Sequence, residues 1–318
     1  MYKKILILFL YSFILFKIYP NESWLEISGG NYSIVEEQNP NIRLIDEKMI
    51  INLYSGHYTV NISYTFFNEG NTVTLDVGFP EFSAHFPWKE LDEIKDFRVH
   101  INGNFVKTEY IKSAPHVWNS NYTDVEAWYI NKITFIENEE LNCVVEYRGQ
   151  HSPLGGRARF MEYLYGTAIC WKNGIENFTI EVHNQSYDWI YKFETKFKDF
   201  TLRNENDVII INATEIMPQI QDTFRIYYNY DESDWYSYDD TDRKLTADQL
   251  KLLSKSQLRI IRNLFYAKHG YIFNSKDLDE YFKKRWWYRP YHLFNENIFN
   301  EIEKINIQLI LEEERRRN

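Results

Sequence analysis

The stretch HYTVNISYTF, residues 57–66, decides the fold class of most of the chain. Every second side chain in it is apolar: Tyr58, Val60, Ile62, Tyr64 and Phe66. A period of two places alternate side chains on one face of an extended chain, so the pattern predicts a β-strand with one buried face. The turn-forming NEGN at residues 68–71 and the alternating TVTLDVGF at residues 72–79 complete a predicted hairpin.

Segments of the same kind recur on the C-terminal side of this hairpin. FRVHI at residues 97–101 is followed by Asn102-Gly103, the strongest short hairpin signal. Further alternating runs are NKITFI, LNCVVEY, NFTIEVHN, DVIIINAT and TFRIYYNY. Short strands at near-regular spacing predict an antiparallel all-β, sandwich-like body over residues 24–230, either as one sandwich or as two subdomains divided within residues 111–130.

The N-terminus has the pattern of a secretory signal peptide. Lys3 and Lys4 precede the apolar run ILILFLYSFILF at residues 5–16, which is too short for a bilayer span of about 20 residues. We therefore predict a signal peptide over residues 1–23 and an exported protein, periplasmic or extracellular, with no integral membrane span after cleavage. No A-x-A cleavage site follows the run, and Asn21-Glu22-Ser23 is only a poor small-residue site, so an uncleaved N-terminal anchor is the alternative.

The sequence contains two cysteines, Cys143 and Cys170. Both lie in strand-like segments, and neighbouring strands would bring their Cα atoms within bridging distance. In an exported chain such a pair forms either a disulfide or two buried thiols. Neither cysteine has the CxxC spacing of a metal or redox site.

Charge is unevenly distributed. Residues 241–318 hold 16 Lys and Arg against 11 Asp and Glu, which gives +5, and residues 1–240 hold 20 against 35, which gives −15. The stretch at residues 231–244 begins with six acidic residues in twelve and predicts a solvated linker. Opposite charges let the two parts dock on each other, or the basic part meets an anionic polymer. The acidic total and the lack of a binding motif exclude nucleic acid as a partner.

After residue 244 the period becomes helical. Thr246-x-x-Gln249 and Ser254-x-x-Gln257 are capping boxes, and each predicts the start of a helix. The second helix is expected to bury Leu258, Ile261, Leu264 and Phe265. Ser275 is expected to cap a third helix. Asn295 is expected to cap a fourth helix whose buried stripe is Ile298, Ile302, Ile305 and Leu309. These signals predict a small all-helical domain over residues 245–318.

The run LRIIRNLFYAKHGYIFNSKDLDEYFKKRWWY, residues 258–288, resembles the YARHG domain. The five signature positions are Tyr266, Ala267, Lys268, His269 and Gly270, with Lys268 in place of the arginine. The resemblance includes the Arg262-Asn263 pair and implies a helical domain of exported bacterial proteins with no settled activity. The β region resembles an uncharacterised family of secreted bacterial β proteins, on the basis of Gly29-Gly30, the hairpin at residues 60–80 and YGTAICWKNGIENFTIEV at residues 165–182.

The signature residues are of the kinds expected at the C-terminal end of a helix. Glycine just past a helix adopts the left-handed conformation without steric cost, so Gly270 is predicted to have positive φ. Arg262, Tyr266 and His269 share one helix stripe, which is either a ligand-binding surface or a buried latch. We favour the latch, in which Arg262 pairs with an acid such as Asp279 or Glu280. On this interpretation substitutions of Arg262 and Gly270 damage stability more than substitution of His269.

The segment KKRWWYRPY at residues 283–291 is the strongest candidate for a contact surface. Trp286, Trp287 and Tyr288 stand among cations that include Arg289, and one of the two adjacent tryptophans should be exposed. Such a segment either packs internally or binds sugars and anionic glycans.

The sequence has no catalytic, metal or cofactor motif. It predicts a non-catalytic binding module of the cell envelope whose partner is an envelope protein or an anionic glycan. The alternative is an envelope hydrolase with an inter-domain site around His269.

Overall fold

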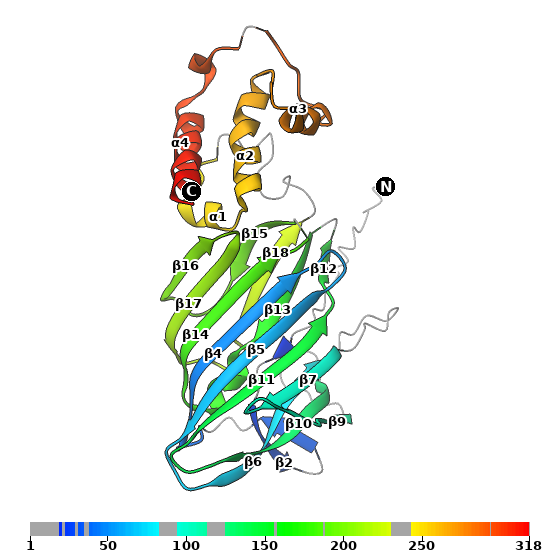
Figure 1. The fold of residues 1–318 in the computed structure, drawn as a ribbon, viewed down its shortest axis with the longest axis vertical. Coiled ribbons are helices and arrows are strands. Elements are labelled where there is room, and N and C mark those ends of the chain that lie inside the picture. Colours follow the sequence, from blue (N-terminus) through cyan, green and yellow to red (C-terminus); the bar gives the residue numbers. More distant parts are fainter. Residues whose placement is uncertain are drawn as a thin grey trace, which may run out of the picture.

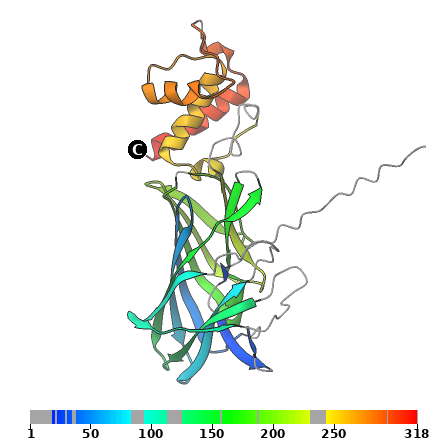
Figure 2. The ribbon, with the colours of Figure 1, turned by 90° about the vertical axis from the view of Figure 1, so that its right-hand side faces the viewer.

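The computed structural model describes residues 19–20, 23–28, 31–34, 38–82, 94–112, 125–155, 158–186, 188–229, 243–292 and 294–317. The apolar N-terminal run, Gly29-Gly30, the aperiodic stretch at 113–124 and the acidic residues 231–242 lie outside this part of the chain. The predicted two-part architecture is confirmed: a β body has a group of helices on one end (Figures 1 and 2).

An eight-stranded sheet forms one side of the body. Its order is β16 (Phe200–Glu205), β17 (Val208–Ile216), β14 (Lys172–Asn184), β4 (Ile42–Leu53), β5 (Tyr58–Asn68), β11 (Glu140–Gly149), β7 (Lys95–Ile101) and β8 (Asn104–Val106). Strand β5 alternates buried and half-buried residues along its whole length, as its sequence predicts. Asn102 and Gly103 have positive φ in the turn between β7 and β8, so the predicted hairpin is confirmed.

Two five-stranded sheets complete the described part of the body. One contains β1 (Tyr19–Pro20), β13 (Ala158–Leu164), β18 (Thr223–Asn229) and β15 (Trp189–Glu194), with β12 (Ser152–Gly155) paired to β13. The other has the order β3 (Asn31–Ile34), β2 (Ser23–Ser28), β6 (Val73–Phe82), β10 (Val125–Phe135) and β9 (Glu109–Lys112), and lies at the end opposite the helices (Figure 1).

The sheets are mainly but not entirely antiparallel. Strands β4 and β14 pair in parallel, although about 130 residues separate their paired positions, for instance Met49 and Ile180. Strand β1 also pairs in parallel with β13. The prediction of an antiparallel body is confirmed in outline. The structure differs from it in the parallel pair at the centre of the large sheet.

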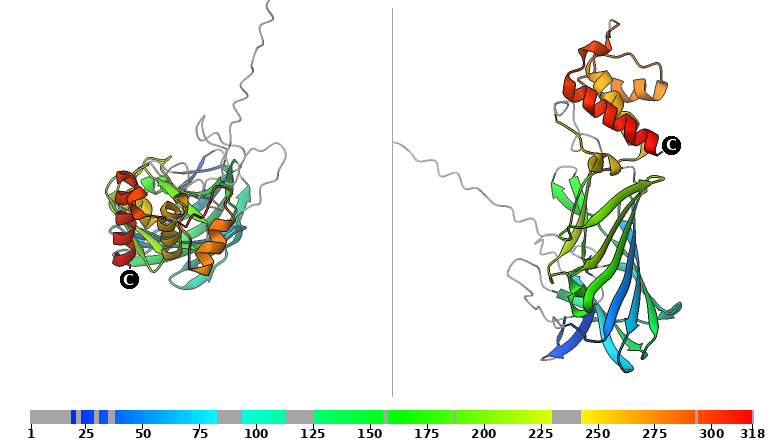
Figure 3. Two further views of the ribbon diagram at one scale, coloured as in Figure 1. Left: turned by 90° about the horizontal axis from the view of Figure 1, so that it is seen from above. Right: turned by 90° about the vertical axis from the view of Figure 1, so that its left-hand side faces the viewer.

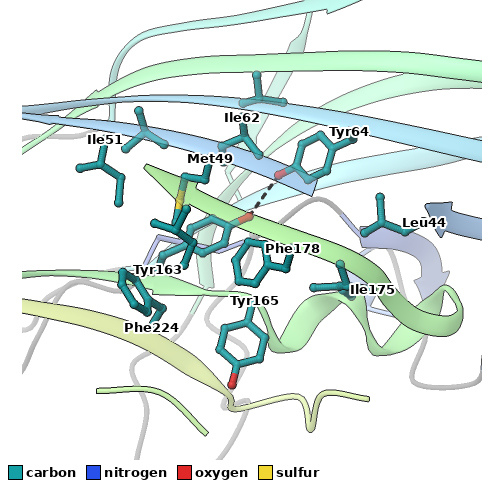
Figure 4. Packing of buried hydrophobic residues seen from close by; sticks show 14 of the residues in the cluster. Leu44, Met49, Ile51, Ile62, Tyr64, Tyr163, Tyr165, Ile175, Phe178 and Phe224 are labelled. Carbon is teal, nitrogen blue, oxygen red and sulfur yellow. Dashed lines mark hydrogen bonds between the residues drawn. The ribbon is translucent and has the colours of Figure 1, made fainter. Parts of the chain in front are cut away.

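The buried side chains of the body form one cluster that draws on all three sheets. The aromatic rings of Tyr163, Phe178 and Phe224 pack among branched aliphatic residues (Figure 4). The cluster also encloses the carboxylate of Glu47. This side chain is buried and accepts a hydrogen bond from the hydroxyl of Tyr163 at 2.6 Å. Burial, reinforced by Glu47, raises the pKa of Tyr163 well above its usual value.

Cys143 and Cys170 are two buried thiols rather than a disulfide. Cys143 lies on β11, and Cys170 ends the short helix η1 (Gly166–Cys170) that leads into β14. Strands β4 and β5 stand between β14 and β11 in the sheet. Of the two alternatives that the sequence left open, the structure therefore has the two buried thiols.

The helical domain consists of α1 (Ala247–Lys251), α2 (Lys255–Lys268), α3 (Lys276–Lys283), η4 (Glu296–Ile298) and α4 (Glu301–Arg316). Both predicted capping boxes form at the starts of α1 and α2. The four residues expected to be buried on α2 are buried. No helix among the described residues is long and apolar enough to cross a membrane.

The fourth helix begins later than predicted. Asn295 caps only the single turn of η4, and Asn300 caps α4 through a box with Glu303. The predicted apolar stripe is wrong at two positions, because Ile298 and Ile305 are exposed, whereas Leu309 packs partly buried against the domain core. The residues that α4 buries are Glu303, Asn306, Ile307, Ile310 and Glu313.

The helices are fixed to the β body through backbone groups. Asp207, in the turn between β16 and β17, accepts a hydrogen bond from the first N–H of α2, that of Lys255, at 2.9 Å. The amide of Asn204 donates to the carbonyls of Lys251 (2.8 Å) and Leu253 (3.3 Å). These contacts hold the domain as an extension of the body along its long axis (Figure 3).

Candidate functional site

The signature residues close α2 in a Schellman motif. The N–H of Gly270 donates to the carbonyl of Ala267, and the N–H of Tyr271 donates to the carbonyl of Tyr266, both at 3.0 Å. Gly270 has φ 79°, in the left-handed region that glycine occupies without steric cost. The prediction that YAKHG ends a helix at a left-handed glycine is confirmed.

A second segment of the chain crosses directly over Gly270. The N–H of Tyr291 donates to the carbonyl of Gly270 at 2.7 Å, and the hydroxyl of Tyr288 donates to the carbonyl of Tyr271 at 2.7 Å. A Cβ atom at position 270 would lie 2.8 Å from the carbonyl oxygen of Arg289. Glycine is therefore needed both for its φ and for the close approach of the second segment.

The segment that crosses Gly270, residues 284–292, is called the presenting segment here because it turns aromatic side chains outward. Trp286 is 80% exposed and Tyr291 is 60% exposed, whereas Tyr288 is buried and Trp287 packs against the domain core. The prediction that one of the two adjacent tryptophans is exposed is confirmed. The buried members fix the segment, so the exposed members have defined positions.

Cations accompany the exposed rings. Lys284 and Arg289 are exposed, and within the described residues neither lies within ion-pair distance of a carboxylate. The guanidinium of Arg285 stacks over the Tyr281 ring, 4.6 Å from its centroid. Lys283 pairs with a carboxylate of its own helix. The presenting segment thus combines two exposed rings with cationic groups that are open to an incoming anion.

The stripe of Arg262, Tyr266 and His269 faces α4 and the segment before it. The Arg262 Nε atom lies 3.0 Å from a carboxylate oxygen of Glu314 on α4. The Tyr266 ring packs edge-on against Phe299 with their centroids 5.0 Å apart. Burial, with a smaller effect from Glu296, raises the pKa of Tyr266. The stripe therefore latches α2 to the C-terminal part of the domain.

The predicted acidic partner of Arg262 is wrong. Asp279 and Glu280 pair with lysines of their own helix, α3. Arg259, one turn earlier on α2, is the residue that reaches α3, where it pairs with Asp277. This pairing, with help from Ser275, holds the pKa of the Asp277 carboxyl well below its usual range.

His269 binds a buried carboxylate. Its Nε2 atom lies 3.0 Å from each oxygen of Glu303, whose side chain is 1% exposed. The same carboxylate accepts the N–H of Asn300 at 3.0 Å, and the ammonium of Lys268 lies 3.4 Å away. Glu303 is also in the first turn of α4, where the helix dipole favours a negative charge. The imidazole therefore satisfies a buried acid.

The position of His269 does not fit the alternative hypothesis of an inter-domain site around this residue. The N-terminus of α2 meets the β body, where Lys255 bonds to Asp207. His269 follows at the far end of this helix, about 20 Å away along its axis. The His269–Glu303 pair therefore lies inside the helical domain.

The remaining signature residues pack locally. Ala267 is fully buried in the domain core. The amide of Asn263 donates to the carbonyl of Arg259 one turn earlier, at 2.7 Å. In the part of the chain that the structure describes, no cluster of three or more His, Cys, Asp or Glu side chains could hold a metal ion. The signature residues therefore shape the end of α2 against which the presenting segment packs.

Two residues that are important in the structure, Tyr291 and Glu303, were not predicted from the sequence. Tyr291 was not among the predicted site residues, yet it is exposed and its N–H donates to the carbonyl of Gly270 at the crossing. Glu303 was not among them either. The pattern Asn300-x-x-Glu303 is a capping-box signal that could have placed this glutamate at a helix start.

Replacement of Gly270 by alanine should destabilise the helical domain more than a matched replacement elsewhere. Gly103 has nearly the same φ, 78°, but a Cβ atom there meets nothing within 4 Å. We expect Gly103→Ala to cost about 1 kcal/mol of backbone strain, and Gly270→Ala at least about 1 kcal/mol more because of the contact with Arg289. Thermal unfolding of the full chain, followed by helix circular dichroism, measures the difference. Equal effects of the two variants would disprove the crossing argument.

The structure reverses the order of damage expected for the latch. His269→Ala removes a partner of a buried carboxylate and should cost about 1–3 kcal/mol. Arg262→Ala breaks a partly exposed pair with Glu314 and should cost less than about 1 kcal/mol. His269→Gln, which keeps a donor, should recover part of the loss. The check is chemical unfolding of the three variants; a larger loss for Arg262→Ala than for His269→Ala contradicts this assignment.

Comparisons with known proteins agree with the architecture. No curated protein matches the chain. The crystal structure of a proposed nutrient binding protein from Legionella pneumophila superposes with a TM-score of 0.51 and 19% identity, covering 94% of this chain and 98% of that chain. This likeness shows a shared fold across both parts of the molecule. An M1 zinc metallopeptidase from Deinococcus radiodurans (TM-score 0.30, 12% identity) covers 60% of this chain and 43% of its own, too weak a likeness to carry an argument. Residues 233–315 match the model of the YARHG domain, so the C-terminal part of the chain has the domain that its YAKHG motif indicated.

Proposed function

We propose that the protein is an exported, non-catalytic binding module of the bacterial cell envelope, and that its presenting segment contacts an anionic glycan. The observation that carries the proposal is the 80% exposure of Trp286 on a segment whose position is fixed by the crossing at Gly270. An exposed indole on a backbone segment whose position is fixed offers a large contact area, and the backbone does not have to be ordered on binding.

The chemistry of the segment favours a ligand with both apolar faces and negative charge. Trp286 and Tyr291 supply flat apolar surfaces on which the carbon faces of sugar rings can lie. Lys284 and Arg289 supply donors for carboxylate or phosphate groups. A polymer of acidic sugars presents both features along its length.

The distribution of charge supports the same ligand. Residues 241–318 carry a net charge of +5, and residues 1–240 carry −15. The presenting segment follows α3, and the contacts with the β body described above are made by α1 and the start of α2, away from the end of α2 that meets this segment. An anionic polymer can therefore approach the basic domain from the side away from the acidic body.

Two further observations favour binding over the hydrolase alternative. The Legionella pneumophila protein with the same fold is itself a proposed nutrient binding protein. A hydrolase acting through His269 would require an imidazole that is open to substrate, whereas the His269 side chain is only 17% exposed and its Nε2 atom faces the buried Glu303. These observations support a role in recognition.

Trp286→Ala should weaken binding of the full chain to an anionic polysaccharide such as polygalacturonate by roughly tenfold, because one aromatic contact contributes about 1–2 kcal/mol. Arg289→Gln should also weaken it and should reduce its dependence on salt. The measurement is co-sedimentation or biolayer interferometry at two ionic strengths.

The body supplies matched controls for this experiment. Phe105 on β8 is 65% exposed and Arg203 on β16 is exposed, so Phe105→Ala and Arg203→Gln should leave polysaccharide binding unchanged. Neutral amylose should bind weakly to every variant. Equal binding by Trp286→Ala and the unchanged protein would exclude the presenting segment as the polysaccharide-binding surface. Retention of an envelope protein instead of polysaccharide would show that the partner is a protein and not a glycan.

Export itself is tested separately. A fusion of residues 1–30 to a phosphatase that is active only outside the cytoplasm should be active, because Lys3, Lys4 and the apolar run at residues 5–16 form a signal sequence. Replacement of Leu8 and Leu10 by arginine interrupts the run and should abolish the activity. An active fusion after that replacement, or an inactive fusion before it, rejects export by this segment.

A further inference from the structure

A polar pocket of about 720 Å³ opens on the outer face of the eight-stranded sheet. Its lining residues are Arg43, Glu69, Lys172, Asn173, Glu176, Asn177, Thr214, Glu215 and Met217. Arg43 alternates with the buried Ile42 and Leu44 on β4, so it points away from the core. The volume is within the range of pockets that bind small molecules.

The walls of the pocket are held in place by irregular backbone. The pairing of β14 with β4 shifts register between Lys172 and Ile175. Within this bulge Gly174 has φ 69°, and a Cβ atom there would lie 2.2 Å from the carbonyl oxygen of Ile216. This close approach fixes the start of β14 against the end of β17. Glu215, on β17, has φ 54°, a conformation that non-glycine residues rarely adopt outside functional or tightly constrained positions.

Two of the three carboxylates in the pocket are already neutralised. Arg43 lies 2.5 Å from Glu176 and 3.0 Å from Glu69, and Lys172 lies 2.6 Å from Glu69. Lys172, followed by Arg43, lowers the pKa of Glu69. Two cations are thus matched by two carboxylates that they contact directly. The pocket keeps one further negative charge, that of Glu215.

Glu215 has no cationic partner within the described part of the chain. Around it stand neutral polar groups, the hydroxyl of Thr214 and the amide of Asn173, and the exposed thioether of Met217. Methionine adapts to irregular carbon skeletons, whereas the hydroxyl and amide donate and accept hydrogen bonds. The lining therefore suits a molecule with one positive charge, several polar groups and a short carbon skeleton.

We propose that this pocket binds a small organic cation, a primary amine with neighbouring hydroxyl or amide groups, whose ammonium pairs with Glu215. An amino sugar and a lysine-containing peptide share this chemistry. The site is distinct from the presenting segment and does not depend on the proposed glycan contact, because it lies on the β body and carries the opposite net charge.

The test compares charged probes with a neutral relative. Glucosamine and Nα-acetyl-lysinamide, each with one ammonium group, are titrated into the isotope-labelled full chain, and backbone amide shifts of β14 and β17 are followed by NMR. N-acetylglucosamine, which has the same ring but no ammonium, should bind at least roughly tenfold more weakly than glucosamine, since it cannot make the charge-assisted bond. Binding of Nα-acetyl-lysinamide without glucosamine assigns the site to peptides, and the reverse assigns it to amino sugars. Binding of neither overturns the proposal.

Variants locate the interaction. Glu215→Gln keeps the size and exposure of the side chain and should weaken the bound amine by roughly tenfold. Glu109→Gln, on the exposed strand β9, changes the net charge equally and should leave affinity unchanged. Equal weakening by both variants would show a general charge effect, and an unchanged Glu215→Gln would show that another group holds the amine. Either result overturns the assignment.

Discussion

The crossing of two chain segments at Gly270 is the constraint on which the helical domain depends. The hydrogen bond from Tyr291 to Gly270 requires a backbone approach that leaves no room for a side chain. The same residue must take a left-handed φ to end α2. One glycine thus sets where the helix stops and where the aromatic segment runs, which explains why the signature ends in glycine.

The polar residues of the domain serve the same architecture. Glu303 and Asn306 are buried on α4, where the sequence pattern predicted aliphatic residues. Glu303 joins His269 to the cap of α4, and the Asn306 amide bonds to the backbone at Arg243 and Leu245 as the chain enters the domain. Groups buried in this way must be satisfied by defined partners, which gives a small domain a unique arrangement at some cost in stability.

Local signals in the sequence predicted most of the fold. The alternation in β5, the Asn102-Gly103 turn and the two serine and threonine capping boxes depend on neighbours only, and all of them formed. The parallel pairing of β4 with β14 could not be predicted, because no local pattern reports a contact across about 130 residues. The start of α4 was misplaced because Asn295 and Asn300 both have cap chemistry, and only tertiary packing chooses between them. Of the site, the exposed tryptophan was predicted but not the backbone crossing that positions it.

The contact between the start of α2 and the turn at Asp207 determines the direction in which the helical domain extends from the body. Strand β4 leads from the pocket at Arg43 towards the helices, and α2 continues in the same direction to the presenting segment (Figure 1). The two elements together set a separation on the order of 50 Å. The junction is held by side chains of the body that bond to backbone groups of the helical domain. The two proposed sites therefore stand at opposite ends of one path through the fold, so a small solute bound in the pocket and a polymer bound at the presenting segment would be kept apart at a distance that the fold defines.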